Sequence, residues 1–416
     1  MSVQALDAWL YGTLVARVER DRDERVRLRF TGEALARWGR GASVLSGLLP
    51  LSDRPPASAA ASAWLRGLMP EGRARSHLAS RAGVAPDDVV GFLAVYGRDT
   101  AGAVTLVPEG TAPDRPDTPA RLLAEESIGA LLDEAAESGT ADQPTSITGL
   151  ESKIVLTAVP GGLAQPTPRL PSTHILKLAR PAGSRSADLT DTEEAALVLA
   201  RACGLGDVEA DHRDFAGRRA LVVRRYDRVL APDRVDRVHQ EDTAQLLGLD
   251  TSDPDRKFQY GRRLPSLREI ATRLDRLGVP LRDLLALTTF NLAIGNTDAH
   301  AKNLSVLHLA DGSHRLAPAY DVSPHTHHAH ADTRFAMDVD GERAMATLGA
   351  QHLVAEATAW GVPPRLARRT VHGTLDRLAA ALDALDRAAH PGVGEAAWTT
   401  VDRRVARLLD DSRRIG

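Results

Sequence analysis

Three oxygen-bearing side chains in one short window of the sequence have the types and the spacing of a phosphoryl-transfer site. Asp298 stands five residues before Asn303, and Asp321 follows eighteen residues after Asn303. In enzymes that transfer the γ-phosphoryl group of ATP, one aspartate accepts the proton of the attacking hydroxyl, while an asparagine and a second aspartate hold magnesium. The spacing therefore predicts Asp298 as the catalytic base and Asn303 with Asp321 as Mg²⁺ ligands.

The elements around these residues support this interpretation. Aspartate and asparagine are also common in turns, so the spacing alone is a weak signal. The apolar pattern of residues 281–295 predicts a buried helix before the polar loop. A short strand at residues 304–309, a turn at Asp311-Gly312 and a second strand at 315–317 predict a hairpin after it, which would return Asp321 beside Asn303. Helix, polar loop, hairpin and carboxylate follow one another as in the C-lobe of a kinase.

Lys177 is the first candidate for a contact with ATP phosphates. It lies in a predicted strand at residues 173–178, among alternating apolar residues, where a solvated lysine would have little reason to stand. Glu193 follows sixteen residues later in a predicted helix, residues 192–202, which Thr190 or Thr192 would cap. Kinases hold the α- and β-phosphates with a strand lysine braced by a helix carboxylate. The alternative is an edge-strand lysine that faces water.

Residues 146–156 combine a short glycine-containing turn with a predicted strand. Backbone N–H groups of such a turn can lie over phosphates, and Lys153 at the start of the strand could reach one. An exposed lysine without a ligand is the alternative. A further predicted strand, residues 219–226, ends in a polar cluster, where backbone groups could meet the edge of adenine.

Composition and charge exclude several classes of protein. The 416 residues contain 52 basic and 55 acidic side chains, a formal net charge of −3, so no strong field draws the chain to nucleic acid or to a membrane. The single cysteine, Cys203, permits no internal disulfide and suits a reducing compartment. No signal-like segment opens the sequence, and no apolar run reaches about 18 residues. We therefore expect a cytoplasmic protein without a membrane-spanning segment.

Several longer motifs resemble those of the HipA family of serine/threonine kinases, the toxins of bacterial toxin–antitoxin pairs. The resemblance covers nearly the whole chain, and its last two motifs are highly specific for the family. The motifs are Leu68 to Gly72, Gly97 to Asp99 with Ala101 to Ala103, Ser146 to Lys153, Pro171 to Lys177, Arg225 to Arg228, His239 to Asp242 with Gln245 and Gly248, Gly295 to Ser305, and Leu316 to Asp321.

The resemblance implies an α+β fold of the two-lobed protein-kinase type, with an extra β-rich N-terminal subdomain and an all-helical C-lobe. We expect an N-terminal subdomain at residues 1–110, a kinase N-lobe at 111–240 and a helical C-lobe at 241–416. The resemblance also implies site roles that the spacing alone does not give. ATP would be bound by Lys177, Lys153, Thr148, Gly149, Glu193, Tyr226 and His300, and Ser146 would be the autophosphorylated serine whose modification ejects the phosphate loop.

Partners follow from the same resemblance. The cofactors would be ATP and Mg²⁺, the substrate a translation factor such as an aminoacyl-tRNA synthetase, and the partner a HipB-like helix-turn-helix antitoxin that brings operator DNA. Two positions depart from the family pattern. Glu151 stands where a neutral amide is usual, and a carboxylate there would repel a phosphate by about 1 kcal/mol at a solvated site. Arg224 stands where glutamate is frequent. Both bear on ATP affinity.

Two hypotheses compete with a growth-arresting protein kinase. One is a HipA-like kinase with a biosynthetic peptide or small molecule as acceptor, and the other is a weakly active scaffold or corepressor for a helix-turn-helix partner. The histidines at 325, 327, 328 and 330 suggest a metal site, but zinc sites favour carboxylate or cysteine company on rigid elements. We therefore expect a flexible or substrate-facing loop there.

Overall fold

The chain divides into two compact units. The computed structural model describes residues 3–21, 23, 25–113, 120–141, 143, 146, 152–231, 234–260 and 265–415. The first unit comprises residues 1–178, 212–255 and 307–314, and the second comprises residues 179–211, 256–306 and 315–416.

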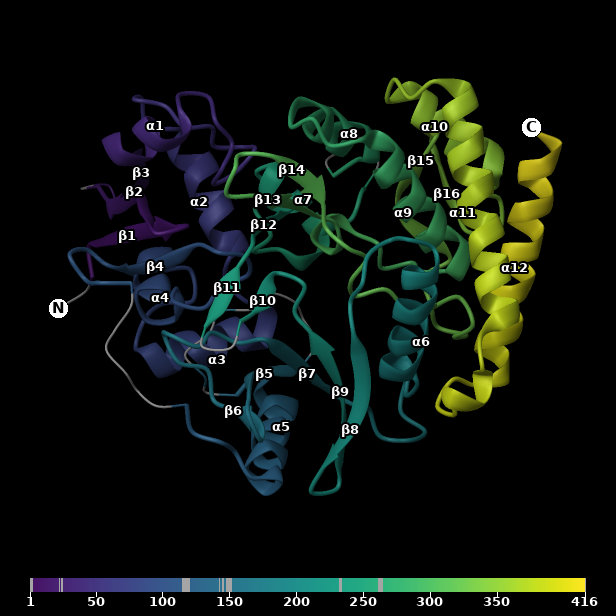
Figure 1. Cartoon of the computed structure of the whole chain (residues 1–416), viewed down its shortest axis with the longest axis horizontal. Helices are drawn as coiled ribbons and strands as arrows, with labels where there is room; N and C mark the ends of the chain where they lie inside the picture. The colour runs from purple at the N-terminus through teal and green to yellow at the C-terminus, as the bar shows by residue number, and fades with distance from the viewer. Residues whose placement is uncertain are drawn as a thin grey trace. The chain divides into compact units, whose positions relative to one another are not determined.

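The first unit begins with a four-stranded antiparallel sheet in the order β3-β2-β1-β4 (Figure 1). Burial alternates along β3, where Val26 and Leu28 point into the core while Arg27 and Arg29 are exposed, as expected of a half-buried strand. The strands are β1 Ala5–Leu10, β2 Thr13–Arg20, β3 Val26–Phe30 and β4 Thr105–Pro108, and the accompanying helices are α1 Gly32–Trp38, α2 Ser58–Gly67, α3 Gly72–Ala82 and α4 Val89–Tyr96.

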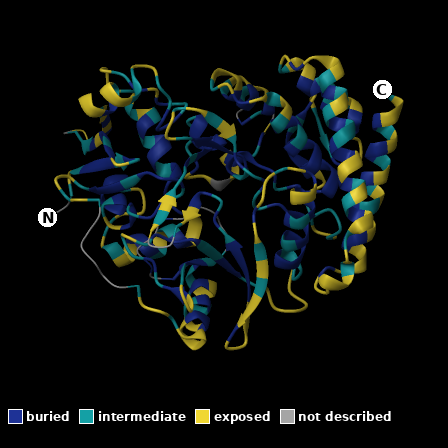
Figure 2. Cartoon of the chain, viewed as in Figure 1, coloured by how far each residue is buried: buried dark blue, intermediate teal, exposed yellow. Residues whose placement is uncertain are grey.

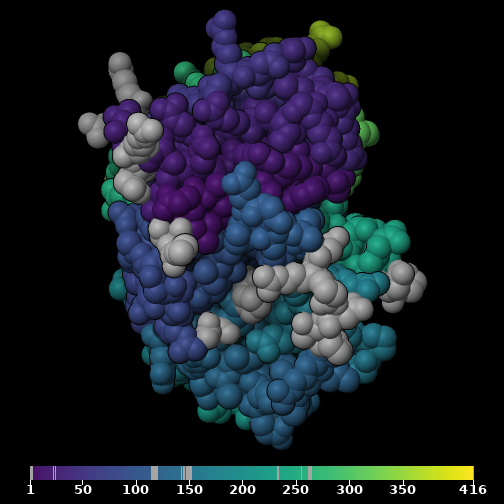
Figure 3. Space-filling model, turned by 90° about the vertical axis from the view of Figure 1, so that its left-hand side faces the viewer, coloured from purple at the N-terminus to yellow at the C-terminus, as the bar shows by residue number. Residues whose placement is uncertain are grey.

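A second sheet of the first unit has the order β6-β5-β7-β9-β8. Its strands are β5 Lys153–Val159, β6 Gly162–Ala164, β7 His174–Leu178, β8 Ala210–Phe215 and β9 Arg218–Arg224. Helix α5, Glu125–Ser138, covers it through Ile128 and Leu132, which share a core with Leu156 and Leu176. In the space-filling view of Figure 3, the N-terminal residues of this unit are purple and its later residues are blue, and both contribute to the surface that faces the viewer.

Short elements complete the first unit. They are β10 Arg228–Leu230, β11 Val235–Arg237, β12 His239–Asp242 and α7 Thr243–Leu246. The hairpin of β13, Ser305–His308, and β14, His314–Leu316, adds to β12 in a three-stranded sheet with the order β12-β13-β14. This confirms the hairpin predicted from the sequence.

A buried charge network joins the first sheet region to the segment after β9. Asp227 accepts hydrogen bonds from Arg225 at 2.7 Å, from Arg228 at 2.9 Å and from the backbone N–H of Gly102 at 2.7 Å. Arg228 also reaches Asp99 at 3.0 Å. All four charged side chains are buried. Burial alone would raise the pKa of Asp227, but the two guanidinium groups outweigh it and leave that pKa well below its ordinary value.

Buried His239 gives the first unit a pH-dependent stability. Burial, and after it the charge of the neighbouring His308, lower the pKa of His239 to about 4. An unfolded histidine has a pKa of about 6.5, so stability present above pH 6.5 is lost as the pH falls toward 4. We expect the urea midpoint, followed by circular dichroism, to fall between about pH 7 and pH 5 and to stay level between about pH 7 and pH 8. A midpoint unchanged down to about pH 5 would contradict this prediction.

The second unit consists mainly of helices (Figure 1). Helix α11 packs against α6, α9, α10 and α12, and Figure 2 shows α12 with one buried and one exposed face. The elements are α6 Leu189–Ala202, η1 Pro254–Lys257, α8 Leu267–Arg276, α9 Leu281–Ile294, η2 Ala301–Asn303, β15 Arg334–Val339, β16 Glu342–Ala344, α10 Ala350–Ala359, α11 Pro364–Ala384, η3 Arg387–Ala389 and α12 Glu395–Arg414. Within the described ranges, no helix combines the length and the apolar character needed to cross a bilayer.

Some element predictions needed correction. Helix α6 starts at Leu189 with Asp188 as its N-cap residue, because Thr192 bonds back to the Asp188 carbonyl and so lies inside the first turn. Residues 239–242 form strand β12, and Asp242 at its end caps α7. Strands β15 and β16 add to the helices expected after residue 240.

Candidate phosphoryl-transfer site

Helix α9 positions the polar loop that carries Asp298. The helix ends at Gly295, whose φ of 82° is left-handed, and a Cβ there would lie 2.2 Å from Thr326 Oγ1, so only glycine fits. The next residue, Asn296, is fully buried and donates to Asn291 Oδ1 of α9 at 2.7 Å. Its own side-chain oxygen accepts from the Asp298 N–H at 2.9 Å. Two asparagine side chains, Asn291 on the helix and Asn296 after it, thus anchor the loop to the helix.

Asp298 and Asn303 lie at the two ends of one turn in the second unit. The side-chain amide of Asn303 donates to the Asp298 carbonyl at 2.9 Å, which leaves the amide oxygen as the acceptor of that side chain. The Asp298 carboxylate is 48% exposed, so a hydroxyl group can reach it from solvent. These features suit a proton acceptor beside an oxygen ligand.

The residue before Asp321 contacts the same turn. The Tyr320 hydroxyl donates to the Lys302 carbonyl at 2.7 Å and lies 2.6 Å from Ser305 Oγ. Asp321 itself has a φ of 53°, a left-handed conformation that costs a non-glycine residue about 1 kcal/mol or more and is typical of functional sites. The amide oxygen of Asn303 and the carboxylate of Asp321 are the donor types that Mg²⁺ prefers.

His300 lies under this turn. Its Nε2 is 3.8 Å from Asp298 Oδ1, and its ring packs edge-on against Phe258 with centroids 5.0 Å apart. Burial lowers the pKa of His300 well below its ordinary value, and nearby Lys257 lowers it further, whereas the charge of Asp321 opposes the shift. The imidazole of His300 is therefore neutral near pH 7 and lies next to the candidate base. Sequence reasoning missed Lys257 and Phe258, because nothing in their local pattern marks them.

In the first unit, the two candidate phosphate-binding lysines are directly opposite one another. Lys153 of β5 pairs with Lys177 of β7 in the antiparallel register, so their side chains stand on the same face of the sheet. Lys177 is buried, and Lys153 is half-buried. Two lysines on one face of the sheet make that face locally positive, which suits the approach of an anion such as a polyphosphate.

Three other predicted site residues have known positions in the structure, and the residues predicted for the phosphate loop do not belong to its described part. Tyr226 follows β9, and its hydroxyl hydrogen bonds to Gln240. Glu193 is buried in α6 of the second unit. Ser146 is buried in the first unit, where its hydroxyl donates to the Leu68 carbonyl at 2.5 Å. The proposed phosphate-loop residues Thr148 and Gly149, together with Glu151, lie outside the described residues.

Comparisons with known proteins agree with these features. Residues 6–107 match the HipA N-terminal domain, and residues 145–382 match the HipA-like C-terminal domain. The putative kinase Y4mE of Sinorhizobium fredii is 32% identical over 400 residues, 92% of each chain. The serine/threonine-protein kinase toxin HipA of Shewanella oneidensis is 30% identical over 345 residues, 79% of this chain and 78% of that one.

A solved structure confirms the predicted fold class. HipA in the Shewanella oneidensis MR-1 complex of HipA, HipB and operator DNA superposes with a TM-score of 0.79 at 24% identity, over 98% of this chain and 97% of that one. The family matches span more than half of the sequence. The chain therefore belongs to the HipA family of serine/threonine kinases.

Proposed function

We propose that the chain transfers the γ-phosphoryl group of Mg²⁺-bound ATP to a serine or threonine hydroxyl of a protein and acts as a growth-arresting toxin. The proposal rests above all on one observation. The turn anchored to α9 carries both Asp298 and Asn303, and the Asn303 side-chain amide donates to the Asp298 backbone carbonyl. The hydroxyl of Tyr320, the residue before Asp321, donates to the Lys302 carbonyl of that same turn.

Each side chain has a separate role in this proposal. Asp298 accepts the proton of the attacking hydroxyl, and His300 beneath it fixes its position. Asn303 and Asp321 would hold Mg²⁺, which neutralises phosphate charge when it is bound. Lys177 and Lys153 contact the phosphate oxygens from their shared sheet face. The proposed nucleotide site has three further parts. They are a helix carboxylate, Glu193, a hinge residue, Tyr226, and a phosphate loop with Thr148 and Gly149.

Loss of Asp321 tests this proposal. A metal clamp on the phosphates contributes several kcal/mol to such reactions, so Asp321→Ala should lower phosphate transfer by roughly 100-fold or more. The measurement is incorporation of labelled γ-phosphate into the chain and into lysate proteins. Asp332→Ala, at an exposed carboxylate of the same unit, is the matched control and should label as the wild type does. Equal labelling by the Asp321→Ala chain would refute the proposed role.

Ser146 would regulate the enzyme by becoming phosphorylated itself. Its hydroxyl is fully buried against the Leu68 carbonyl, so it must leave that position to be modified, and a phosphate could not be accommodated where the hydroxyl now lies. We expect Ser146→Ala to lose self-labelling and to retain transfer to other proteins. Mass spectrometry of the ATP-treated wild type should find phosphate on Ser146, and full self-labelling of the variant would place the regulatory residue elsewhere.

We further propose that the substrate is a translation factor such as an aminoacyl-tRNA synthetase. The partner would be a HipB-like helix-turn-helix antitoxin that contacts operator DNA. The solved complex of Shewanella oneidensis HipA with HipB and operator DNA supports this partner. Phosphoproteomics of cells that briefly express the wild type or Asp298→Asn would identify the substrate. A small-molecule acceptor or a scaffold role would leave no protein labelled above the Asp298→Asn background. The division at residues 1–110, 111–240 and 241–416 stays a prediction.

A further inference from the structure

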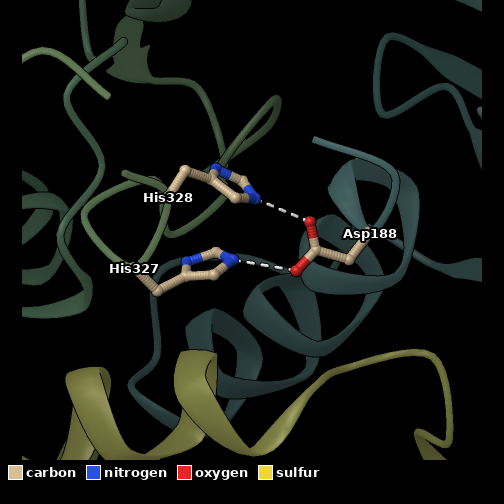
Figure 4. Close-up of side chains that lie close together, drawn as sticks. All are labelled: Asp188, His327 and His328. Atoms are coloured by element: carbon tan, nitrogen blue, oxygen red, sulfur yellow. Dashed lines mark hydrogen bonds and ion pairs between the residues drawn. The ribbon is translucent and has the colours of Figure 1, made fainter. Parts of the chain in front are cut away.

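A carboxylate and two imidazoles converge in the second unit, beyond the residues assigned to phosphoryl transfer. Asp188 is the N-cap residue of α6, and each of its carboxylate oxygens forms a hydrogen bond with one histidine (Figure 4). One oxygen lies 2.8 Å from His327 Nε2, and the other lies 2.7 Å from His328 Nε2. The histidines belong to the segment that follows Asp321, 139 and 140 residues after Asp188. The carboxylate company that the sequence did not reveal is therefore supplied by a distant part of the chain.

These three ligand atoms are almost spaced for a metal ion. One ligand atom from each residue lies within 4.8 Å of the other two. In a tetrahedral zinc site with bonds of about 2.0–2.1 Å, neighbouring ligand atoms are about 3.3 Å apart. The observed N···O distances of 2.8 and 2.7 Å run to different oxygens of Asp188, so an ion would replace these two hydrogen bonds with bonds to the imidazoles and the carboxylate.

The backbone holds both sides of this cluster in place without a metal. The His325 N–H donates to the Gly295 carbonyl at 3.0 Å, and the His328 N–H donates to the His325 carbonyl at 2.9 Å. On the other side, Thr192 Oγ1 of α6 lies 2.7 Å from Ser323 Oγ. The loop predicted at these residues therefore makes hydrogen bonds to both α6 and the end of α9. A site with pre-positioned ligands loses little entropy when an ion binds.

The donor atoms of the cluster favour a cation as well. His327 Nδ1 is buried and has no hydrogen-bond partner within the described ranges. A carboxylate oxygen beside two imidazole nitrogens is a common donor set for transition metals.

We infer that Asp188, His327 and His328 form a site for a divalent transition metal, with Zn²⁺ as the best match. Two imidazoles and one carboxylate suit Zn²⁺ in a site whose fourth position is taken by water. Mg²⁺ prefers oxygen ligands and would remain with Asn303 and Asp321. The ion would link the start of α6 to the segment after Asp321.

Direct titration tests this inference without ATP or Mg²⁺, so its outcome is independent of the proposed kinase activity. The full chain, without a polyhistidine tag, is stripped with a chelator, dialysed and titrated with Zn²⁺ by calorimetry, with Co²⁺ absorbance as a second reporter. We expect about one ion per chain and a rise in Tm of roughly 5 °C at saturating Zn²⁺. X-ray absorption of the Zn²⁺ form should report two imidazole nitrogens and carboxylate oxygen.

Variants separate this site from the other histidines of the chain. The double variant His327→Gln/His328→Gln and the single variant Asp188→Asn should lose the bound ion and the Tm shift. Two matched controls should keep both: His330→Gln, at an exposed histidine of the same segment, and Asp321→Asn, at the proposed Mg²⁺ ligand. Circular dichroism establishes that each variant is folded. The inference is overturned if the folded wild type binds no stoichiometric ion, or if the double variant binds Zn²⁺ as the wild type does.

Discussion

Replacing Asp298 by asparagine is expected to lower kcat for phosphate transfer by about 10²–10⁴-fold. Asparagine keeps the size of the side chain but cannot accept a proton from the attacking hydroxyl. The hydrogen bonds that shape the turn use the backbone N–H and carbonyl of Asp298, and the substitution leaves both in place. The loss should therefore appear in the chemical step, with the fold and the binding of ATP unchanged.

Single-turnover transfer of labelled phosphate measures this effect, and equilibrium binding of a fluorescent ATP analogue measures the affinity separately. Asp410→Asn, at an exposed carboxylate of α12 paired with Arg414, is the matched control and should retain full activity. A wild-type rate in the Asp298→Asn enzyme would remove Asp298 from the mechanism. A loss of ATP binding with the rate preserved at saturation would assign Asp298 to nucleotide recognition instead.

Removal of the Asp227 carboxylate is expected to cost the first unit about 3–5 kcal/mol in free energy of unfolding. The carboxylate is buried and accepts from both Arg225 and Arg228, so Asp227→Ala leaves two guanidinium groups in the interior without their shared counter-charge. The Gly102 N–H also loses its acceptor. Breaking a buried pair from one side is costly because the remaining charge is still desolvated.

Urea denaturation followed by tryptophan fluorescence gives this free energy. The control is Asp236→Ala, which removes an exposed carboxylate 2.9 Å from Arg234 in the neighbouring β10-β11 hairpin. An exposed pair contributes about 1 kcal/mol or less, so the control should unfold nearly as the wild type does. Equal destabilisation by the two substitutions would show that burial does not determine how much the network contributes to the free energy of unfolding.

Local patterns explain which parts of the fold were predictable. The continuous apolar pattern of residues 281–295 predicted α9, and the two short strands around Asp311-Gly312 predicted the hairpin β13-β14. Both depend on residues that are neighbours in sequence. Strand β12 was missed because Glu241 is held by the distant Ser46 and His308, at 2.7 and 2.9 Å, and no local signal reports such partners.

The same distinction applies to the candidate sites. Asp298 and Asn303 lie on one short turn, so their proximity follows from their spacing. The register that places Lys153 opposite Lys177 depends on the pairing of β5 with β7, which the sequence does not encode locally. The shared partner of His327 and His328 could not be predicted from their local sequence, because Asp188 lies at the start of helix α6, far earlier in the chain.

The most direct test of the account is a crystal structure of the full chain with Mg²⁺ and a non-hydrolysable ATP analogue. We predict a magnesium ion about 2.0–2.1 Å from the Asn303 amide oxygen and from the Asp321 carboxylate, with phosphate oxygens completing its shell. The Asp298 carboxylate should face the γ-phosphate, and it should not take the place of Asn303 or Asp321 as a magnesium ligand. A magnesium ion coordinated by other residues, with Asn303 and Asp321 turned away from the nucleotide, would contradict the account.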